Sequence, residues 1–261
     1  MTTMTADDAV LSLRLALGPQ DLLAAQRLRY QGFALEMGAS GPTVDHQARL
    51  ERDEFDTHVD HLLLVDTRRD PLNLDHVVGA YRLLPPERLA AAGRYYSEGE
   101  FDLSRLKTSG RRLLELGRTC VHPDVRGGAA MVLMWNGLAE YVLERRIEVL
   151  FGAASFPGVN AAALSQSLAY LHHFHRAPEE LRVTARAEQG MDLSVAADID
   201  KVTALARIPA LIRAYLRLGG FVSDGAFVDH AFNTTDVCLV MDTAQMSLRH
   251  KAYYTRKKAR E

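Results

Sequence analysis

Glu115, Gly117 and Arg118 place two charged side chains and a glycine inside an otherwise mostly apolar stretch, Arg112–Val121. The stretch is typical of a central β-strand, where a charged side chain must pair with another group or line a cavity. Glycine weakens a strand, so it often marks a bulge or the close approach of a ligand. Glu115 is therefore a candidate general base, although a structural ion pair explains the same residues equally well.

A turn with two glycines follows this strand, and helical spacing of apolar residues begins directly after it, over Ala129–Arg145. Free backbone N–H groups and the positive end of a helix dipole favour an anion at such a position. Arg126 adds a fixed charge suited to phosphate. An ordinary strand-to-helix turn has the same pattern. The candidate phosphate-binding residues are Val121, Arg126, Gly127, Gly128 and Ala129.

Two other groups of reactive side chains are predicted to have neither a catalytic nor a metal-binding role. Cys120 is a rival nucleophile, but a buried cysteine usually behaves as a small hydrophobic residue. His172, His173 and His175 suggest a metal, yet their spacing is not that of a zinc site and no cysteine or carboxylate pattern supports one. The sequence therefore predicts no metal site.

The elements that must position these residues form a mixed α/β order, β-α-β-β-β-α-β with a C-terminal extension. Strands are predicted at 11–17, 61–65, 77–84, 112–121, 147–154, 181–185 and 237–241, and helices at 21–33, 129–145, 160–175 and 208–218. Residues 36–58 are expected to be irregular, and 87–110 to form a loop-like insertion with a short helix. We expect a disordered start at 1–10, a single domain at 11–248 and a basic tail at 249–261.

Bulk properties limit the classes of function. A length of 261 residues suits one α/β domain with an extension. The net charge of -2 gives no sign of a nucleic-acid partner. Two cysteines make no disulfide framework, and neither a signal peptide nor a run of about 18 apolar residues occurs. These features predict a cytoplasmic protein. The basic stretch Arg249–Arg260 either is a solvated tail or contacts anionic lipid, such as the inner membrane, or an acidic protein.

The element order, with an anion-binding turn after the fourth strand, resembles the GNAT fold, a mixed central sheet flanked by helices. Three clusters resemble acyl-homoserine lactone synthases and a related branch, the ornithine N-acyltransferases of bacterial lipid synthesis. These clusters are Arg29 with Phe33, the acids Glu51, Asp53 and Asp56, and Arg82 with Glu115 and Arg118.

Longer motifs resemble the ornithine N-acyltransferase branch over roughly residues 12–255. The matching segments are Tyr95–Leu103, Leu114–Val121, Phe151–Phe156, Tyr215–Gly219, Asp224–Asp229 and Phe232–Val237. The resemblance implies transfer of a 3-hydroxyacyl chain from acyl carrier protein to the α-amino group of ornithine. It implies no cofactor beyond the phosphopantetheine thioester of the donor.

The resemblance also suggests a role for each cluster. Glu115 would deprotonate the α-ammonium group, directly or through a water molecule, and Arg118 would bind the substrate carboxylate or hold the acidic cluster. The cluster of Glu51, Asp53 and Asp56 would bind the cationic amino acid, unless these acids only solvate a loop or cap a helix. Arg29 and Arg82 would bind the carboxylate or organise the acids.

The phosphate turn departs from the GNAT pattern, which has Gln or Arg, two residues, Gly, one residue, and Gly or Ala. Here Arg126 is followed by no glycine at the fourth place and by Met131 at the sixth. The arm of a carrier protein has only one phosphate, whereas coenzyme A has a pyrophosphate. The departure therefore favours acyl carrier protein as the donor. The alternatives are an acyl-homoserine lactone synthase using S-adenosylmethionine and a non-catalytic membrane-surface protein on a GNAT scaffold.

Overall fold

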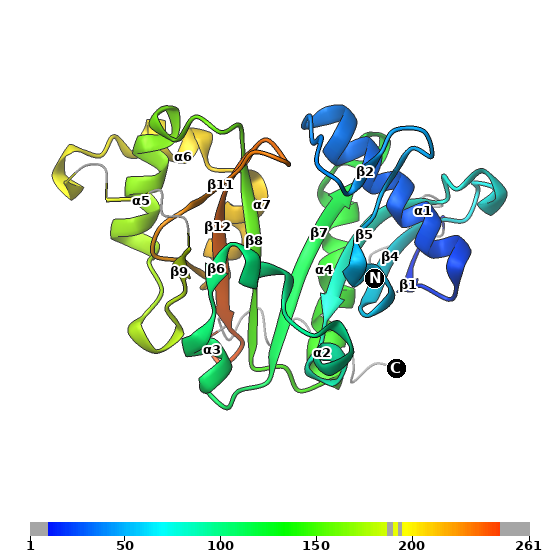
Figure 1. The fold of residues 1–261 in the computed structure, drawn as a ribbon, viewed down its shortest axis with the longest axis horizontal. Helices are drawn as coiled ribbons and strands as arrows, with labels where there is room; N and C mark the ends of the chain where they lie inside the picture. Colours follow the sequence, from blue (N-terminus) through cyan, green and yellow to red (C-terminus); the bar gives the residue numbers. More distant parts are fainter. Residues whose placement is uncertain (1–9, 187–189, 193–194, 246–261) are drawn as a thin grey trace, which may run out of the picture. The chain divides into compact units, whose positions relative to one another are not determined.

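The computed structural model describes residues 10–186, 190–192 and 195–245 (Figure 1). The predicted basic tail lies outside these residues, as does the predicted disordered start except for Val10. In the part of the chain that is described, no helix is long and apolar enough to cross a membrane. The chain forms two compact units, the first from residues up to Ala92 with Leu116–Arg145, and the second from Gly93–Glu115 with residues from Arg146 onward. A single domain over 11–248 stays a prediction.

The first unit is built on antiparallel strands. Strand β4 pairs with β1 on one side and with β5 on the other, and the sheet order then continues to β7. A two-stranded hairpin, β2 with β3, follows the first helix in the chain. The bounds are β1 Leu11–Leu15, β2 Val44–Asp45, β3 Leu50–Glu51, β4 Asp60–Asp66, β5 Val77–Leu84 and β7 Leu113–Val121.

Helices lie against this sheet (Figure 1). The α-helices are α1 Pro19–Arg29, α2 Pro86–Ala92 and α4 Gly128–Glu144, with shorter helical segments η1 Tyr30–Glu36, η2 Glu54–Thr57, η3 Pro71–Asn73 and η5 Pro123–Val125. Proline at the start of α1 and Asp21 in its first turn suit a helix N-terminus. Helix α1 continues into η1 as a π-helical turn, a form that often occurs at functional sites.

Strand alternation gives the sheet of the first unit two different faces. Leu63 and Ala80 are opposite each other on β4 and β5 and pack in one core cluster with Ala24 and Leu28 of α1. The next pair, Leu64 and Gly79, faces the other way, toward α4. The sheet is therefore buried between α1 and α4, which explains why the predicted strands of this unit are almost continuously apolar.

The second unit includes the first residues of β7. Leu113–Glu115 pair in parallel with β8, and β8 pairs antiparallel with β12 along its whole length. Strands β10 and β11 pair antiparallel with β12, and β6 pairs with β9 in a separate ribbon. The bounds are β6 Phe101–Asp102, β8 Val149–Pro157, β9 Thr184–Ala185, β10 Phe221–Val222, β11 Phe227–Asp229 and β12 Thr234–Asp242.

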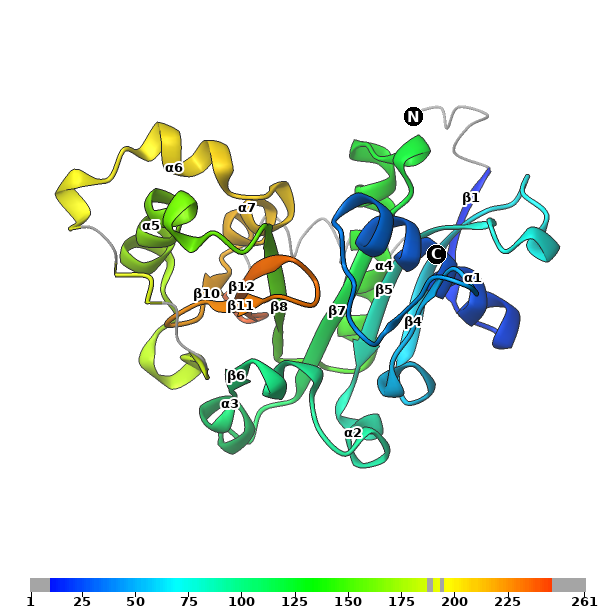
Figure 2. The same cartoon turned by 45° about the horizontal axis from the view of Figure 1, so that its top comes forward.

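Two helices of the second unit contact this part of the sheet, and a third packs on one of them (Figure 2). They are α3 Ser104–Thr108, α5 Ser165–His175, α6 Lys201–Arg207 and α7 Ala210–Arg217, with shorter segments η4 Tyr96–Gly99, η6 Ala161–Leu164, η7 Glu179–Leu181 and η8 Ala196–Asp198. Helix α5 contacts α6 and β10, and α7 contacts β12.

The predicted mixed sheet flanked by helices is confirmed, since parallel and antiparallel pairs occur together. The longer predicted elements are all present, with ends shifted by a few residues. Short elements were missed: β10, β11 and α6 were not predicted, and 87–110 contains two α-helices where one was expected. Strands of two or three residues are too short to show a periodic pattern.

Candidate active site

Strand β7 carries the three residues that the sequence singled out, but its regular alternation is interrupted at Arg118. The backbone of Arg118 has φ of 50°, the left-handed region that non-glycine residues seldom adopt. A regular strand would put Arg118 on the face opposite Glu115 and Gly117, but strict alternation does not apply at a residue with this backbone. Such a conformation costs about 1–3 kcal/mol, and residues of this kind cluster at active sites.

The carboxylate of Glu115 is buried and held by backbone donors. The N–H of Tyr96 donates to Oε2 at 2.8 Å and that of Ser97 donates to Oε1 at 2.7 Å. Both donors belong to η4, which is itself fixed by a hydrogen bond from the Tyr95 N–H to Glu98. Two N–H donors stabilise the ionised carboxylate, the form that a general base requires.

A closed network of arginines and acids occupies the first unit. Arg29, only 1% exposed, donates from Nε to Glu51 Oε2 at 2.6 Å and from Nη1 and Nη2 to the two oxygens of Asp56 at 2.6 and 2.7 Å. Its Nη2 also donates to the backbone oxygen of Glu51 at 2.6 Å. Two-point contacts of this kind are the strongest arginine–carboxylate arrangement.

Arg82 and Arg118 complete the network. Arg82 Nη1 lies 2.6 Å from Asp53 Oδ2 and 3.4 Å from Asp56 Oδ1. Arg118 links Glu51 to Asp53, with its Nε 3.2 Å from Glu51 Oε1 and its Nη2 3.2 Å from Asp53 Oδ2. Three arginines and three acids thus alternate around a ring, and their formal charges cancel.

The ring sets the ionisation of its acids. Burial by itself would raise the pKa of Asp56, but hydrogen bonds and charge from Arg29 and charge from Arg82 bring that pKa well below its usual range. For Asp53, burial is likewise outweighed by the charges of Arg82 and Arg118, and its pKa is lowered. Burial opposes the charge of Arg29, but Glu51 and Asp56 raise its pKa. All these groups therefore stay charged near neutral pH.

The structure brings the predicted acids and arginines together, but in contacts with one another. Glu51, Asp53 and Asp56 each have arginine partners, so their predicted part in binding a cationic amino acid stays a prediction. Asp53 also accepts the N–H of Phe55 at the start of η2, the helix-capping alternative. Phe33, in η1, packs against the core cluster that contains α1.

The predicted phosphate-binding residues gather at the N-terminus of α4. Gly128 begins the helix, and Gly127 caps it without a side-chain hydrogen bond. A Cβ added at either glycine would have no atom within 4 Å. Arg126 donates from Nε to the backbone oxygen of Val121 at 2.9 Å and pairs with Glu36. The turn is therefore open at the helix end, as an anion site requires, and its role stays a prediction.

Cys120 has a structural environment. It packs in the core cluster with Ala24 and Leu28, and burial raises the pKa of its thiol to about 12. A thiol with such a pKa is protonated near neutral pH and is a poor nucleophile. Cys120 thus behaves as the small hydrophobic residue that the sequence favoured.

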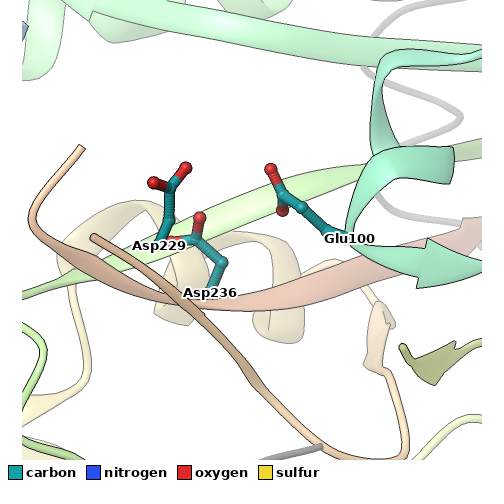
Figure 3. A group of neighbouring side chains, drawn as sticks. All are labelled: Glu100, Asp229 and Asp236. Carbon is teal, nitrogen blue, oxygen red and sulfur yellow. The ribbon is translucent and has the colours of Figure 1, made fainter. Parts of the chain in front are cut away.

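A second acidic group was missed at the level of sequence. Glu100, Asp229 and Asp236 each offer a carboxylate oxygen, and the three oxygens lie within 4.8 Å of one another (Figure 3). All three residues fall inside motifs that resemble the ornithine N-acyltransferase branch, but no chemistry was assigned to them. Only the pairing of β11 with β12 and the position of η4 bring them together.

Comparison with known proteins shows which family and which folds this chain resembles. The Acetyltransferase (GNAT) domain family matches residues 28–136. The fold is similar to that of an N-acyl amino acid synthase from uncultured soil microbes, with TM-score 0.51, 12% identity, and coverage of 92% of this chain and 96% of that one. A CoA-dependent acyl-homoserine lactone synthase, solved with SAM and isopentyl-CoA, gives TM-score 0.52 and 14% identity over 95% and 89% of the two chains. Identities this low show the fold only.

Sequence relatives define the family. The L-ornithine N(alpha)-acyltransferase of Rhodobacter capsulatus is 56% identical over 97% of this chain and 98% of its own length. Proteins of the same name from Brucella abortus and Rhizobium meliloti are 40% and 39% identical over 94% of this chain and cover 88% and 84% of their own lengths. The chain therefore belongs to the L-ornithine N(alpha)-acyltransferase family.

Proposed function

We propose that this protein transfers a (3-hydroxy)fatty acyl group from acyl carrier protein to the α-amino group of L-ornithine and so forms a lyso-ornithine lipid. The observation that carries the proposal is 56% identity to the Rhodobacter capsulatus L-ornithine N(alpha)-acyltransferase over nearly the whole length of both chains. The similarity to acyl-homoserine lactone synthases is limited to the fold, so ornithine is favoured over S-adenosylmethionine as the acceptor.

The reaction is the aminolysis of a thioester. The α-ammonium group loses a proton to Glu115, directly or through a water molecule, and the amine attacks the thioester carbon. Attack forms the C–N bond and a tetrahedral intermediate, and the nitrogen then loses its second proton. The intermediate collapses with cleavage of the C–S bond, and the phosphopantetheine thiolate leaves and takes up a proton as the thiol. A simple thiol has a pKa of about 8.5, so this leaving group needs no strong general acid.

The surroundings of Glu115 support a proton transfer through water. Ser97, whose N–H holds the Glu115 carboxylate, has a buried hydroxyl without a hydrogen-bond partner in the described part of the chain. A hydroxyl that can both donate and accept is suited to hold a water molecule beside the carboxylate. Backbone N–H groups of β7 are the candidates for stabilising the oxyanion of the tetrahedral intermediate.

The donor site is proposed at the N-terminus of α4. One phosphate of a carrier-protein arm would meet the open backbone N–H groups at Gly128 and Ala129 and the positive end of a 17-residue helix. Arg126 lies half exposed at the rim of the turn, and it would exchange its contact with Glu36 for one with the phosphate. We place the peripheral membrane contact, which would deliver the lipid product, in the basic stretch Arg249–Arg260.

The arginine ring is proposed to position the acceptor carboxylate. Arg118 contacts its two acids at 3.2 Å, longer than the 2.6 Å contacts of Arg29 and Arg82. Of the three arginines, Arg118 is the one next to the glycine of β7, and it is proposed to turn toward a substrate carboxylate. Arg29 and Arg82 would then keep the acids, and through them Arg118, in place.

Purified protein with 3-hydroxyacyl carrier protein and L-ornithine tests the proposal by mass spectrometry of the product. We expect lyso-ornithine lipid, with little product when acyl-CoA replaces the carrier protein. Acylation of S-adenosylmethionine but not of ornithine would contradict the proposed acceptor. No acyl transfer from either donor to any amine would support the non-catalytic alternative.

A further inference from the structure

The acidic group Glu100, Asp229 and Asp236 gathers three carboxylates in the second unit. Glu100 and Asp236 are buried and Asp229 is partly exposed. Figure 3 shows the Glu100 side chain projecting toward the other two carboxyl groups. Carboxylates at this spacing repel one another, and a cation between them relieves that repulsion.

Strand register shows that the group has a fourth polar member. Asp229 on β11 is directly opposite Thr234 on β12, and Thr234 and Asp236 are two residues apart on the same strand. These side chains therefore lie on one face of the sheet. Thr234 is only 1% exposed. Its hydroxyl has no hydrogen-bond partner in the described part of the chain. A buried hydroxyl in this position can accept a hydrogen bond from a bound ligand.

The acidic oxygens are close enough together to bind one ammonium group. Three oxygens that each accept a hydrogen bond of about 2.8 Å along the tetrahedral directions of one nitrogen are about 4.6 Å apart. The three carboxylate oxygens lie within 4.8 Å of one another. An ammonium group has three or more N–H donors and needs no further ligands, whereas Ca²⁺ takes about six to eight oxygens.

The acidic group and Glu115 share one supporting segment. Ser97 of η4 donates its N–H to Glu115, and Glu100 follows it by three residues. Three residues of such a tight helix rise about 6 Å, so η4 holds the backbone of Glu100 in the same region as the donors to Glu115. Burial is the main cause that raises the pKa of the Cys238 thiol, and the negative charges of Glu115 and Glu100 raise it further. Both carboxylates therefore lie near Cys238.

The same face of the sheet connects the two positions. Glu115 is opposite Phe151, Phe151 is opposite Val240, and Val240 shares a face with Asp236. Between them on β8 lie Ala153 and Ser155, which are small and partly exposed. An acceptor chain can therefore extend over this face from Glu115 toward Asp236.

We propose that Glu100, Asp229 and Asp236 bind the side-chain ammonium group of the acceptor amino acid and select ornithine over neutral amino acids of equal length. The inference rests on the proposed function, since it assumes an acceptor with a second amine. It moves recognition of this cation from the arginine-paired acids Glu51, Asp53 and Asp56 to a different group of carboxylates.

Asp229→Asn is the discriminating variant. Asp229 Oδ1 accepts the N–H groups of Ala231 and Phe232 in the hairpin loop, and the amide oxygen of asparagine preserves both bonds while the charge is lost. Kinetics are measured with L-ornithine and with L-norvaline, which has the same carbon chain without the second amine. We expect KM for ornithine to rise about tenfold or more, with little change in kcat and no loss of norvaline acylation. Asp198→Asn, an exposed acid in the same unit, is the control.

Two results would overturn the inference. One is an unchanged preference for ornithine over norvaline in both Asp229→Asn and Asp236→Asn. The other is saturable binding of Ca²⁺ or Mg²⁺ at this group that ornithine does not displace, which would make it a metal site. If the wild type acylates no ornithine, the proposed function fails separately. Calorimetric binding of ornithine to wild type and Asp229→Asn then tests the site, and equal affinities would contradict it.

Discussion

At the scale of single residues, charge pairing distinguishes two sets of carboxylates. Glu51, Asp53 and Asp56 alternate with arginines in a ring, whereas Glu115 is held by two backbone N–H groups. A carboxylate held by backbone donors keeps oxygen lone pairs for a further partner. The acids of the ring are paired with guanidinium groups, and the proposal gives proton transfer to Glu115.

Glu115→Gln should lower kcat by about 10²–10⁴-fold, the usual contribution of a general base. Acyl transfer is followed by product formation, and circular dichroism checks the fold, because the glutamine NH₂ would face one of the two N–H donors. Glu180→Gln, an exposed position in the same unit, is the control and should keep wild-type activity. Undiminished transfer by the Glu115 variant would show that the base has been assigned wrongly.

Arg29→Met should destabilise the protein by about 3–5 kcal/mol, since it leaves Glu51 and Asp56 buried without their shortest ion pairs. Urea unfolding gives the free energy. Arg68→Met is the matched control, because that side chain is 63% exposed in its pair with Asp66 and should lose at most about 1 kcal/mol. Equal losses in the two variants would argue against a structural role for the ring.

At the scale of elements, close packing of α4 on the sheet fixes the turn that precedes it. Gly79 lets α4 approach β5, since a Cβ there would lie 2.8 Å from Met134 Sδ and 3.0 Å from Leu64 Cβ. Helix α4 starts at Gly128, so its distance from the sheet also sets the position of the proposed phosphate site. A change in this packing is expected to affect both the stability of the protein and the binding of the acyl donor.

Gly79→Val should cost about 1–3 kcal/mol by overpacking between β5 and α4 and should raise KM for the acyl donor more than for ornithine. Chemical unfolding and steady-state kinetics measure the two effects. Gly18→Ala serves as the comparison, because no atom lies within 4 Å of a Cβ at that extended residue. A Gly79 variant with wild-type stability would contradict the packing argument.

At the scale of the whole molecule, buried ion pairs connect stability to pH. Asp21, Asp53 and Asp56 all have pKa values below the ordinary 3.8, Asp21 chiefly through its hydrogen bond from Arg14. A carboxyl group whose pKa is lower in the folded state contributes stability that is complete above its unfolded pKa. That contribution is lost as pH falls toward and through the folded pKa.

The contribution of these three aspartates to the free energy of unfolding should therefore be nearly constant between pH 5 and 7. It should fall steeply below about pH 4. Urea titrations across this range measure it. Asp56→Asn should be less stable than wild type at pH 6 but should lose less stability on acidification. The same acid sensitivity in both proteins would show that Asp56 does not contribute to the transition.

The sequence by itself determined the long elements, the strand that carries Glu115, and the turn before α4, because hydrophobic period, glycine and proline are local signals. The charged residues of the ring could be named in advance. Only the tertiary structure decided how they pair, since Glu51 and Arg118 are 67 residues apart in the chain. It likewise placed Glu100 beside Asp229 and Asp236, and it put the backbone irregularity at Arg118, next to the glycine that suggested it. Side chains brought together by sheet register and helix packing leave no periodic trace in the sequence, and this is why the second acidic group was found only in the fold.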